Sequence, residues 1–454
     1  MDCKPYLRAH ADELIESLAA LIRIPSVEGA PAENAPYGRE VARCLDEALA
    51  LCERLGFHTH SMDHRVGWCE YGEGEEMIAV LGHLDVVPAG DGWTESEPFS
   101  GEVKNGRIYG RGAMDDKGPV VAAVYALAAL KDAGFTPARR IRVLFGTNEE
   151  TGCGDMAWYR EHGGEKPVMG FTPDGEYPII NGEKGILNGT FARRLHQSGA
   201  YRLTRFEGGS ACNVSPACAA AELACPAEAA GRIAADKVTV TPIEGGIRVE
   251  AQGVSAHGST PEQGENAIGR LAQALAQLPL EGELADCMAF LAERIGMETR
   301  GESLGLAMRD ELSGDLTVNL GVASFADETL SLTFSIRYPV TKTCDEVYPR
   351  MARAFSLGGF AETQMHHDAA LYVPPESELI RKLSQVYEAE TGETAELKCI
   401  GGGTYAKSMP GLVAFGPIFP GDEVREHKSD EYMEIERLLQ NAEIIAAAMY
   451  ELAK

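Results

Sequence analysis

The chain has 454 residues, of which 44% are hydrophobic and 24% are charged, and its formal net charge at pH 7 is −28. This length allows two or three domains with substantial cores, and the composition is typical of globular proteins. The strong negative charge argues against nucleic acid or an anionic membrane surface as a partner, so we expect neither.

The N-terminal segment is predicted to form a surface helix rather than a signal peptide. Acidic residues interrupt its apolar residues, which repeat at helical spacing from Leu14 to Ile22. The 11 cysteines are scattered and form no Cys-x-x-Cys pair, which favours free thiols over a disulfide framework. These features predict a cytoplasmic protein.

Strands and helices are predicted to alternate through the first 184 residues. Helices are expected at 39–55 and 119–130, and strands at 77–87 and 140–145. The helices follow from apolar spacing with glycine or proline at their ends, and the strands from nearly continuous apolar runs. A repeated strand, helix, strand order predicts a right-handed α/β sheet.

The pattern changes near residue 185. Alternating apolar and polar residues predict antiparallel strands at 238–240, 247–251, 316–322 and 330–336, with a helix at 266–278. After Pro374 the α/β pattern returns, with a helix at 378–390, strands at 397–400 and 413–415, and a long C-terminal helix. We therefore expect an α/β catalytic domain with a mixed, mostly parallel sheet flanked by helices. It would be built from residues 1–184 and 371–454, with an α+β domain inserted at 185–370.

Acidic and imidazole side chains recur where these predicted strands end. The set comprises His83, Asp85, Asp115, Asp116, Glu149, Glu150, Asp174 and His427. Strand ends meet at one edge of an α/β sheet, and imidazoles with carboxylates suit a pair of divalent metals. Each segment alone is more often a surface acidic pair, a helix cap or a structural histidine. Their joint occurrence predicts a two-metal hydrolase with the metals at the strand ends.

The spacing within each segment suggests different roles for neighbouring residues. Residues two apart on an extended backbone point the same way, so His83 can bind a metal while Asp85 supports it. One of the adjacent carboxylates Asp115 and Asp116 could bridge two cations. Their mutual repulsion requires metals or Lys117 to offset it.

Further residues are candidates for contacts with the substrate. Of the adjacent Glu149 and Glu150, one can be a ligand and the other a general base. Arg337 lies on the polar face of its predicted strand and could grip a carboxylate, although a surface arginine is the common alternative. Gly402 and Gly403 lie in a glycine run that Thr404 follows. The backbone N–H groups of this segment could bind an anion, although a plain tight turn explains the glycines equally well.

Together these motifs resemble those of the M20 metallopeptidases. The resemblance rests on His-x-Asp at 83–85, Gly-Arg-Gly with Asp-Asp-Lys-Gly at 110–118, Glu-Glu-x-Gly at 149–152 and the late His427. Segments at 171–174, 336–339, 401–405 and 431–433 are closer to the dipeptidase V branch. The resemblance covers essentially the whole chain.

The resemblance implies a role for each matched residue. Asp115 would bridge two metals, with His83 and Asp174 completing one site and Glu150 and His427 the other. Glu149 would be the general base and Asp85 would hold His83. The inserted domain would be a lid, in which His257 polarises the scissile carbonyl with Asn213 as its companion. Arg337 would bind the terminal carboxylate of the substrate.

The expected activity is hydrolysis of small dipeptides that carry a free terminal carboxylate. A water activated between two Zn²⁺ ions, with Mn²⁺ or Co²⁺ as substitutes, would attack with Glu149 as base. One alternative is an N-acyl-amino-acid amidohydrolase, because the metals and Arg337 would serve that reaction too. Another is a catalytically silent relative that binds peptides or metal. A large lid makes a monomer or a weak homodimer the expected state.

Overall fold

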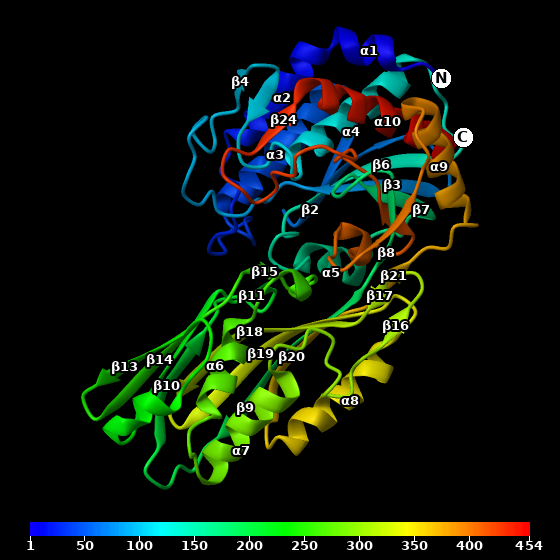
Figure 1. Cartoon of the computed structure of the whole chain (residues 1–454). Helices are drawn as coiled ribbons and strands as arrows, with labels where there is room; N and C mark the ends of the chain where they lie inside the picture. Colours follow the sequence, from blue (N-terminus) through cyan, green and yellow to red (C-terminus); the bar gives the residue numbers. More distant parts are fainter. The chain divides into compact units, whose positions relative to one another are not determined.

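The computed structural model describes residues 1–454, with the exception of the side chain of Ala227. The chain divides into two units (Figure 1). The first unit contains residues 1–181, 373–398 and 403–454, and the second contains residues 182–372 and 399–402. Where the chain leaves and re-enters the first unit, the backbone N–H of Val373 donates to the carbonyl of Asn181 at 2.8 Å.

A mixed sheet forms the centre of the first unit. Its strands run in the order β1 (His58–Met62), β2 (Val66–Tyr71), β6 (Arg140–Gly146), β3 (Met77–His83), β7 (Met169–Thr172), β23 (Leu412–Ala414) and β8 (Ile179–Glu183). The four strands β6, β3, β7 and β23 are parallel, and antiparallel strands flank them on both sides. These central strands are almost wholly buried, as expected for parallel strands covered on both faces.

Helices cover the sheet of the first unit. They are α1 (Lys4–Ala9), α2 (Ala11–Ile22), α3 (Arg39–Arg54), α4 (Lys117–Asp132), α5 (Gly154–Glu161), α9 (Glu378–Thr391) and α10 (Ile435–Ala453). Helix α4 packs against α2, α10 and β3, and it is buried along nearly its whole length. A small sheet of β4 (Glu102–Lys104), β5 (Arg107–Tyr109) and β24 (Tyr432–Glu434) lies beside this layer (Figure 1).

The second unit is built on an antiparallel sheet. Its order is β13 (Val238–Ile243), β14 (Gly246–Gln252), β12 (Cys218–Ala224), β10 (Arg202–Gly208), β18 (Thr317–Ala326), β19 (Thr329–Tyr338), β9 (Gly185–Arg194) and β20 (Ala361–Asp368). The helices α6 (Ala267–Leu275), α7 (Gly282–Phe290) and α8 (Cys344–Leu357) share a hydrophobic core with it. A separate two-stranded sheet joins β11 (Val214–Ser215) and β15 (Ala256–His257).

The structure confirms the predicted fold class and most predicted elements. The strand expected at 77–87 is shorter and ends at His83, the residue that pairs with Gly146 at the end of β6. The N–H of Leu84 still donates to the carbonyl of Gly146, whereas the N–H of Val86 donates to the carbonyl of Ser26 instead of continuing the ladder. Among the helices of the described residues, none is both long and apolar enough to cross a membrane.

Candidate metal centre

The predicted metal ligands come together in the first unit, at the carboxyl ends of its parallel strands. His83 is the last residue of β3, Asp174 follows β7, and Glu149 and Glu150 lie in the loop after β6. Asp115 lies in the loop that precedes α4. The ends of β3, β6 and β7 therefore lie close to one another and bring these residues together.

The side chain of Asp115 lies between two imidazoles. Its Oδ1 is 2.9 Å from Nε2 of His83, and its Oδ2 is 3.0 Å from Nε2 of His427. His427 Nε2 also lies 3.0 Å from Oε2 of Glu150, and His83 Nε2 lies 3.9 Å from Oδ2 of Asp174. Each oxygen of one carboxylate thus faces a different histidine, which is the arrangement that a bridging ligand requires.

Two groups of side chains are compact enough to hold a metal ion. Potential ligand atoms of His83, Asp115 and Glu150 lie within 4.8 Å of one another, and so do those of His83, Glu149 and Asp174. The carboxylate of Glu149 therefore faces the same space as the predicted ligands. Distance alone leaves Glu149 able to act either as a ligand or as a base.

Hydrogen bonding fixes which nitrogen of His83 faces the acids. Its Nδ1 donates to the backbone carbonyl of Asp85 at 2.9 Å, so Nε2 is the nitrogen that faces Asp115 and would bind a metal ion after losing its proton. The Asp85 carboxylate lies farther away, at 3.5 Å from Nδ1. That carboxylate instead accepts the backbone N–H groups of Glu149 at 3.2 Å and Glu150 at 3.0 Å. Asp85 therefore supports the acidic loop as well as the histidine.

Hydrogen bonds with the acids favour the charged form of both imidazoles. Burial alone would lower the pKa of His83, but hydrogen bonds with Asp115 and Asp85 outweigh it and raise that pKa well above its usual range. Hydrogen bonds with Asp115 and Glu150 raise the pKa of His427 to about 11. The pKa of Asp115 is lowered, because its hydrogen bonds with the two histidines outweigh the effect of burial.

The surrounding acids carry more negative charge than these histidines balance. Burial and the charge of Asp174 raise the pKa of Glu149 and of Asp116 well above the usual range. Burial and the charge of Asp115 raise the pKa of Glu426 to about 8. Asp116 accepts the backbone N–H of His83 through Oδ2, while its buried Oδ1 has no hydrogen-bond partner. Crowded acids with raised pKa values mark a place where cations would be stabilising.

Lys117 does not neutralise these acids, although the sequence allowed that role. Its buried ammonium donates to the backbone carbonyls of Leu21 at 2.9 Å and Ile24 at 2.8 Å. Asp116 is the N-cap residue of α4, but its side chain makes no capping hydrogen bond to the helix. Bound cations would offset the charge of these acids in place of protons, and a mixed histidine and carboxylate donor set fits Zn²⁺, Mn²⁺ or Co²⁺.

A second buried carboxylate, missed in the sequence analysis, holds the acidic loop. Oδ2 of Asp155 accepts the backbone N–H groups of Thr147 at 2.6 Å and Asn148 at 3.1 Å, and also the hydroxyl of Tyr405. The Tyr405 ring packs edge-on against His83, with centroids 5.9 Å apart. Together, Asp85 and Asp155 accept the backbone N–H groups of four consecutive residues, 147–150. A buried acid in Gly-Cys-Gly-Asp was the available signal.

In the second unit, the structure brings two predicted residues together. Val214 pairs with His257 across β11 and β15, and the N–H of Gly258 donates to the carbonyl of Asn213 at 2.6 Å. Asn213 and His257 are both exposed, and Nδ1 of His257 lies 2.6 Å from the hydroxyl of Ser259. This geometry is compatible with the predicted partnership of Asn213 and His257.

Arg337 is not the surface arginine that was the common alternative. It lies on β19, is only 5% exposed, and its Nε has no hydrogen-bond partner. Burial lowers the pKa of its guanidinium. Burying a guanidinium with an unused donor costs free energy of folding unless an anion binds it.

The glycine run is divided between the two units. Gly402 belongs to the second unit, whereas Gly403 and Thr404 belong to the first. The Thr404 hydroxyl accepts the N–H of Ala406 at 3.1 Å and caps the short helix Tyr405–Ser408. This cap gives Thr404 a structural task in addition to the predicted contact with substrate.

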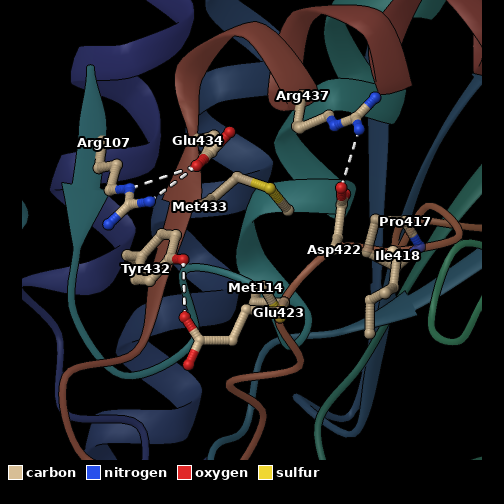
Figure 2. A pocket seen from close by; sticks show the side chains of 11 residues that line it. Arg107, Met114, Pro417, Ile418, Asp422, Glu423, Tyr432, Met433, Glu434 and Arg437 are labelled. Atoms are coloured by element: carbon tan, nitrogen blue, oxygen red, sulfur yellow. Dashed lines mark hydrogen bonds and ion pairs between the residues drawn. The ribbon is translucent and has the colours of Figure 1, made fainter.

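A pocket of about 270 Å³ lies in the first unit beside the loop that carries Asp115 (Figure 2). Met114 and Tyr432 contribute to its wall, whereas the predicted metal ligands do not line it. Its two arginines are already paired, Arg107 with Glu434 at 2.9 Å and Arg437 with Asp422 at 2.8 Å. The pocket therefore offers no unpaired positive charge to an anionic ligand and is separate from the metal centre.

Comparison with known proteins decides the family. Residues 79–451 match the model of peptidase family M20/M25/M40. The chain belongs to this family. It is 38% identical over 459 residues to the putative dipeptidase YtjP of Bacillus subtilis, covering 98% of both chains. It is 33% identical over 467 residues to the Beta-Ala-Xaa dipeptidase of Lactobacillus delbrueckii subsp. lactis, covering 100% of this chain and 99% of that protein.

Solved structures of dipeptidases share the fold of this peptidase. Human carnosine dipeptidase 1 matches with a TM-score of 0.58 at 17% identity, covering 99% of both chains. A di-peptidase from Saccharomyces cerevisiae matches with a TM-score of 0.61 at 14% identity, covering 99% of this chain and 98% of that one. The predicted class, an M20-type metallopeptidase resembling dipeptidases, is confirmed.

Proposed function

We propose that this M20 peptidase hydrolyses dipeptides with a free terminal carboxylate, using two divalent metal ions and Glu149 as general base. The observation that carries the proposal is Asp115, whose two oxygens lie 2.9 and 3.0 Å from two different histidines. The dipeptidase names of full-length relatives at 33% and 38% identity support the same substrate class.

The residues divide into two ligand sets that share Asp115. His83 and Asp174 would hold one ion with it, and Glu150 and His427 would hold the other. We propose Zn²⁺ as the native metal, with Mn²⁺ and Co²⁺ as substitutes, because mixed imidazole and carboxylate sites accept all three. When bound, divalent cations would lower the pKa of a water molecule and polarise the scissile carbonyl.

Glu149 is the proposed proton carrier. It would take a proton from the attacking water and return it to the leaving amine, which requires a carboxyl group whose pKa lies near the working pH. Burial raises its pKa toward that range, and Asp174 adds to the effect. The bonds from Asp85 and Asp155 to the backbone of its loop fix its position.

The inserted domain, proposed at residues 185–370, would act as a lid that binds the substrate. Arg337 would hold the terminal carboxylate through two parallel hydrogen bonds, while His257 and Asn213 would stabilise the charge that develops on the carbonyl oxygen. Gly402 and Gly403 would add backbone N–H groups. The cytoplasmic location and the monomeric or weakly dimeric state stay predictions.

The proposal is tested by an activity screen on metal-free protein reloaded separately with Zn²⁺, Mn²⁺ and Co²⁺. The panel contains free dipeptides, β-alanyl dipeptides and N-acetylated dipeptides. Faster turnover of free dipeptides supports the dipeptidase, whereas faster turnover of the N-acetylated forms favours the amidohydrolase alternative. Metal binding without any turnover would identify a catalytically silent relative.

Replacing Arg337 with methionine is expected to remove recognition of the substrate carboxylate. We expect kcat/KM for a free dipeptide to fall by about 10²- to 10³-fold, mainly through KM, because a charged bidentate contact is lost. The same dipeptide with an amidated C-terminus should be a poor substrate for the wild type and should lose little more in the variant. If both substrates lose activity equally, Arg337 does not bind the carboxylate.

Metal uptake is expected to release protons, since hydrogen bonds with the acids raise the pKa values of His83 and His427 in the metal-free protein. Metals bind neutral imidazole and ionised carboxylate, so both histidines and the acids with raised pKa values should lose protons on binding. Metal affinity should therefore rise with pH, because a lower proton concentration favours the deprotonated rings. Calorimetry in buffers of different ionisation enthalpy measures the release.

The matched variant for this measurement is His427→Asn. It should release about one proton fewer than the wild type while His83 still contributes its own. Metal uptake by the wild type without proton release at pH 7 would contradict the assigned charge states.

A further inference from the structure

Glu431 is a fully buried carboxylate to which the mechanism above assigns no task. Its Oε1 accepts three backbone N–H groups, from Gly112 at 3.0 Å, Met114 at 2.9 Å and Asp115 at 3.3 Å. All three lie in the loop that carries the proposed bridging ligand. Gly112 has a positive φ of 87°, which lets this loop direct several N–H groups at one oxygen.

The same residue belongs to the segment that carries the other proposed ligand. His427 lies four residues before Glu431, and its Nε2 is 3.0 Å from Oδ2 of Asp115. Asp430, the residue before Glu431, also anchors this segment, because its Oδ1 accepts the backbone N–H groups of Thr94 and Glu95, each at 2.8 Å. Glu431 therefore joins the two segments whose side chains meet at the metal centre.

Strand β24 continues this connection away from the metal centre. Tyr432 pairs with Tyr109 of β5, and the side chains of Tyr432 and Met433 lie near Met114 in the neighbouring pocket (Figure 2). The position of Glu431 is thus set by regular strand pairing on one side and by the loop N–H groups on the other.

We infer that Glu431 is a positioning residue that holds Asp115 and His427 in register for the metal ion they share. The inference rests on the proposed function. Groups that orient metal ligands without touching the metal typically affect affinity by about 10- to 100-fold when they are removed. The part of Glu431 that matters is the oxygen that accepts the three N–H groups, rather than its negative charge.

A competing explanation is that Glu431 only neutralises Arg111. Oε2 of Glu431 lies 2.5 Å from Nη1 of Arg111, and both side chains are buried. Two conservative variants separate these tasks. Glu431→Gln keeps an oxygen for the three N–H groups and loses the charge, whereas Glu431→Asp keeps the charge and withdraws the oxygen by one methylene.

The experiment titrates metal-free full-length protein with Co²⁺, measuring affinity and the visible absorption of the bound ion. Glu431→Gln is expected to bind within about threefold of the wild type, and Glu431→Asp about 10- to 100-fold more weakly with an altered spectrum. Glu434→Gln, three residues further along at the end of β24, is exposed and paired with Arg107; it is the matched control and should match the wild type.

Equal Co²⁺ affinities in the two Glu431 variants, or the reverse order, would overturn the inference. If Glu431→Asp does not fold, as judged by circular dichroism, Glu431→Gln decides alone, and a loss of more than about tenfold in its affinity overturns the inference. A wild type that binds no divalent metal would instead refute the proposed function, so the two failures are distinguishable.

Discussion

Glu149→Gln is expected to lower kcat/KM for a dipeptide by about 10⁴-fold while both metals stay bound. Glutamine has nearly the same shape but cannot accept a proton from water or return one to the leaving amine. The backbone N–H of residue 149 still donates to Asp85 in this variant, so the loop should keep its place. Steady-state kinetics together with metal analysis of the purified variant provide the measurement.

The control for this variant is Glu161→Gln, an exposed glutamate at the end of α5 whose replacement should leave kcat/KM unchanged. Near-full activity of Glu149→Gln with its metals bound would exclude Glu149 as the base. Loss of activity together with loss of metal would instead make Glu149 a ligand, which its distance to His83 and Asp174 also allows.

Asp115→Asn is expected to weaken binding of both metals by more than about 100-fold and to abolish measurable activity. Asparagine removes the negative charge between His83 and His427 and presents an N–H group to one of the two imidazoles. Because both proposed sites share this residue, neither ion should keep wild-type affinity. Competition with a chromophoric chelator measures the two dissociation constants.

The neighbouring Asp116→Asn is the matched control for this experiment. Burial and the charge of Asp174 raise the pKa of Asp116, which favours its neutral form, and asparagine is a close mimic of that form. Its side-chain oxygen can still accept the N–H of His83. Metal affinity should change by less than about tenfold, and equal losses in the two variants would contradict the bridging role of Asp115.

Local patterns were sufficient to predict the sheet and the meeting of the ligands. A continuous apolar strand such as β3 must be buried, and polar residues at its end then face the same edge as those after β6 and β7. The end of β3 was misplaced because its pairing stops where β6 stops at Gly146. A strand boundary set by a neighbour cannot be read from the strand's own residues.

The supporting contacts could not be predicted, because they depend on segments far apart in the chain. The ammonium of Lys117 reaches carbonyls 93 and 96 residues away, rather than the acids beside it in sequence. Glu431 accepts N–H groups more than 310 residues distant. The burial of Arg337 likewise follows from its place between β18 and β9, whereas its own strand pattern allowed a surface position.

The pairing of Asn181 with Val373 has a consequence for how such enzymes diversify. The chain departs from the first unit and returns to it at two hydrogen-bonded neighbours, so the intervening 191 residues form a closed excursion. Insertions, deletions and exchanges within these residues change the segment between two fixed points. They leave in place the strand ends that carry the proposed metal ligands. Selection could therefore remodel the residues proposed to bind the substrate without disturbing those proposed to hold the metals.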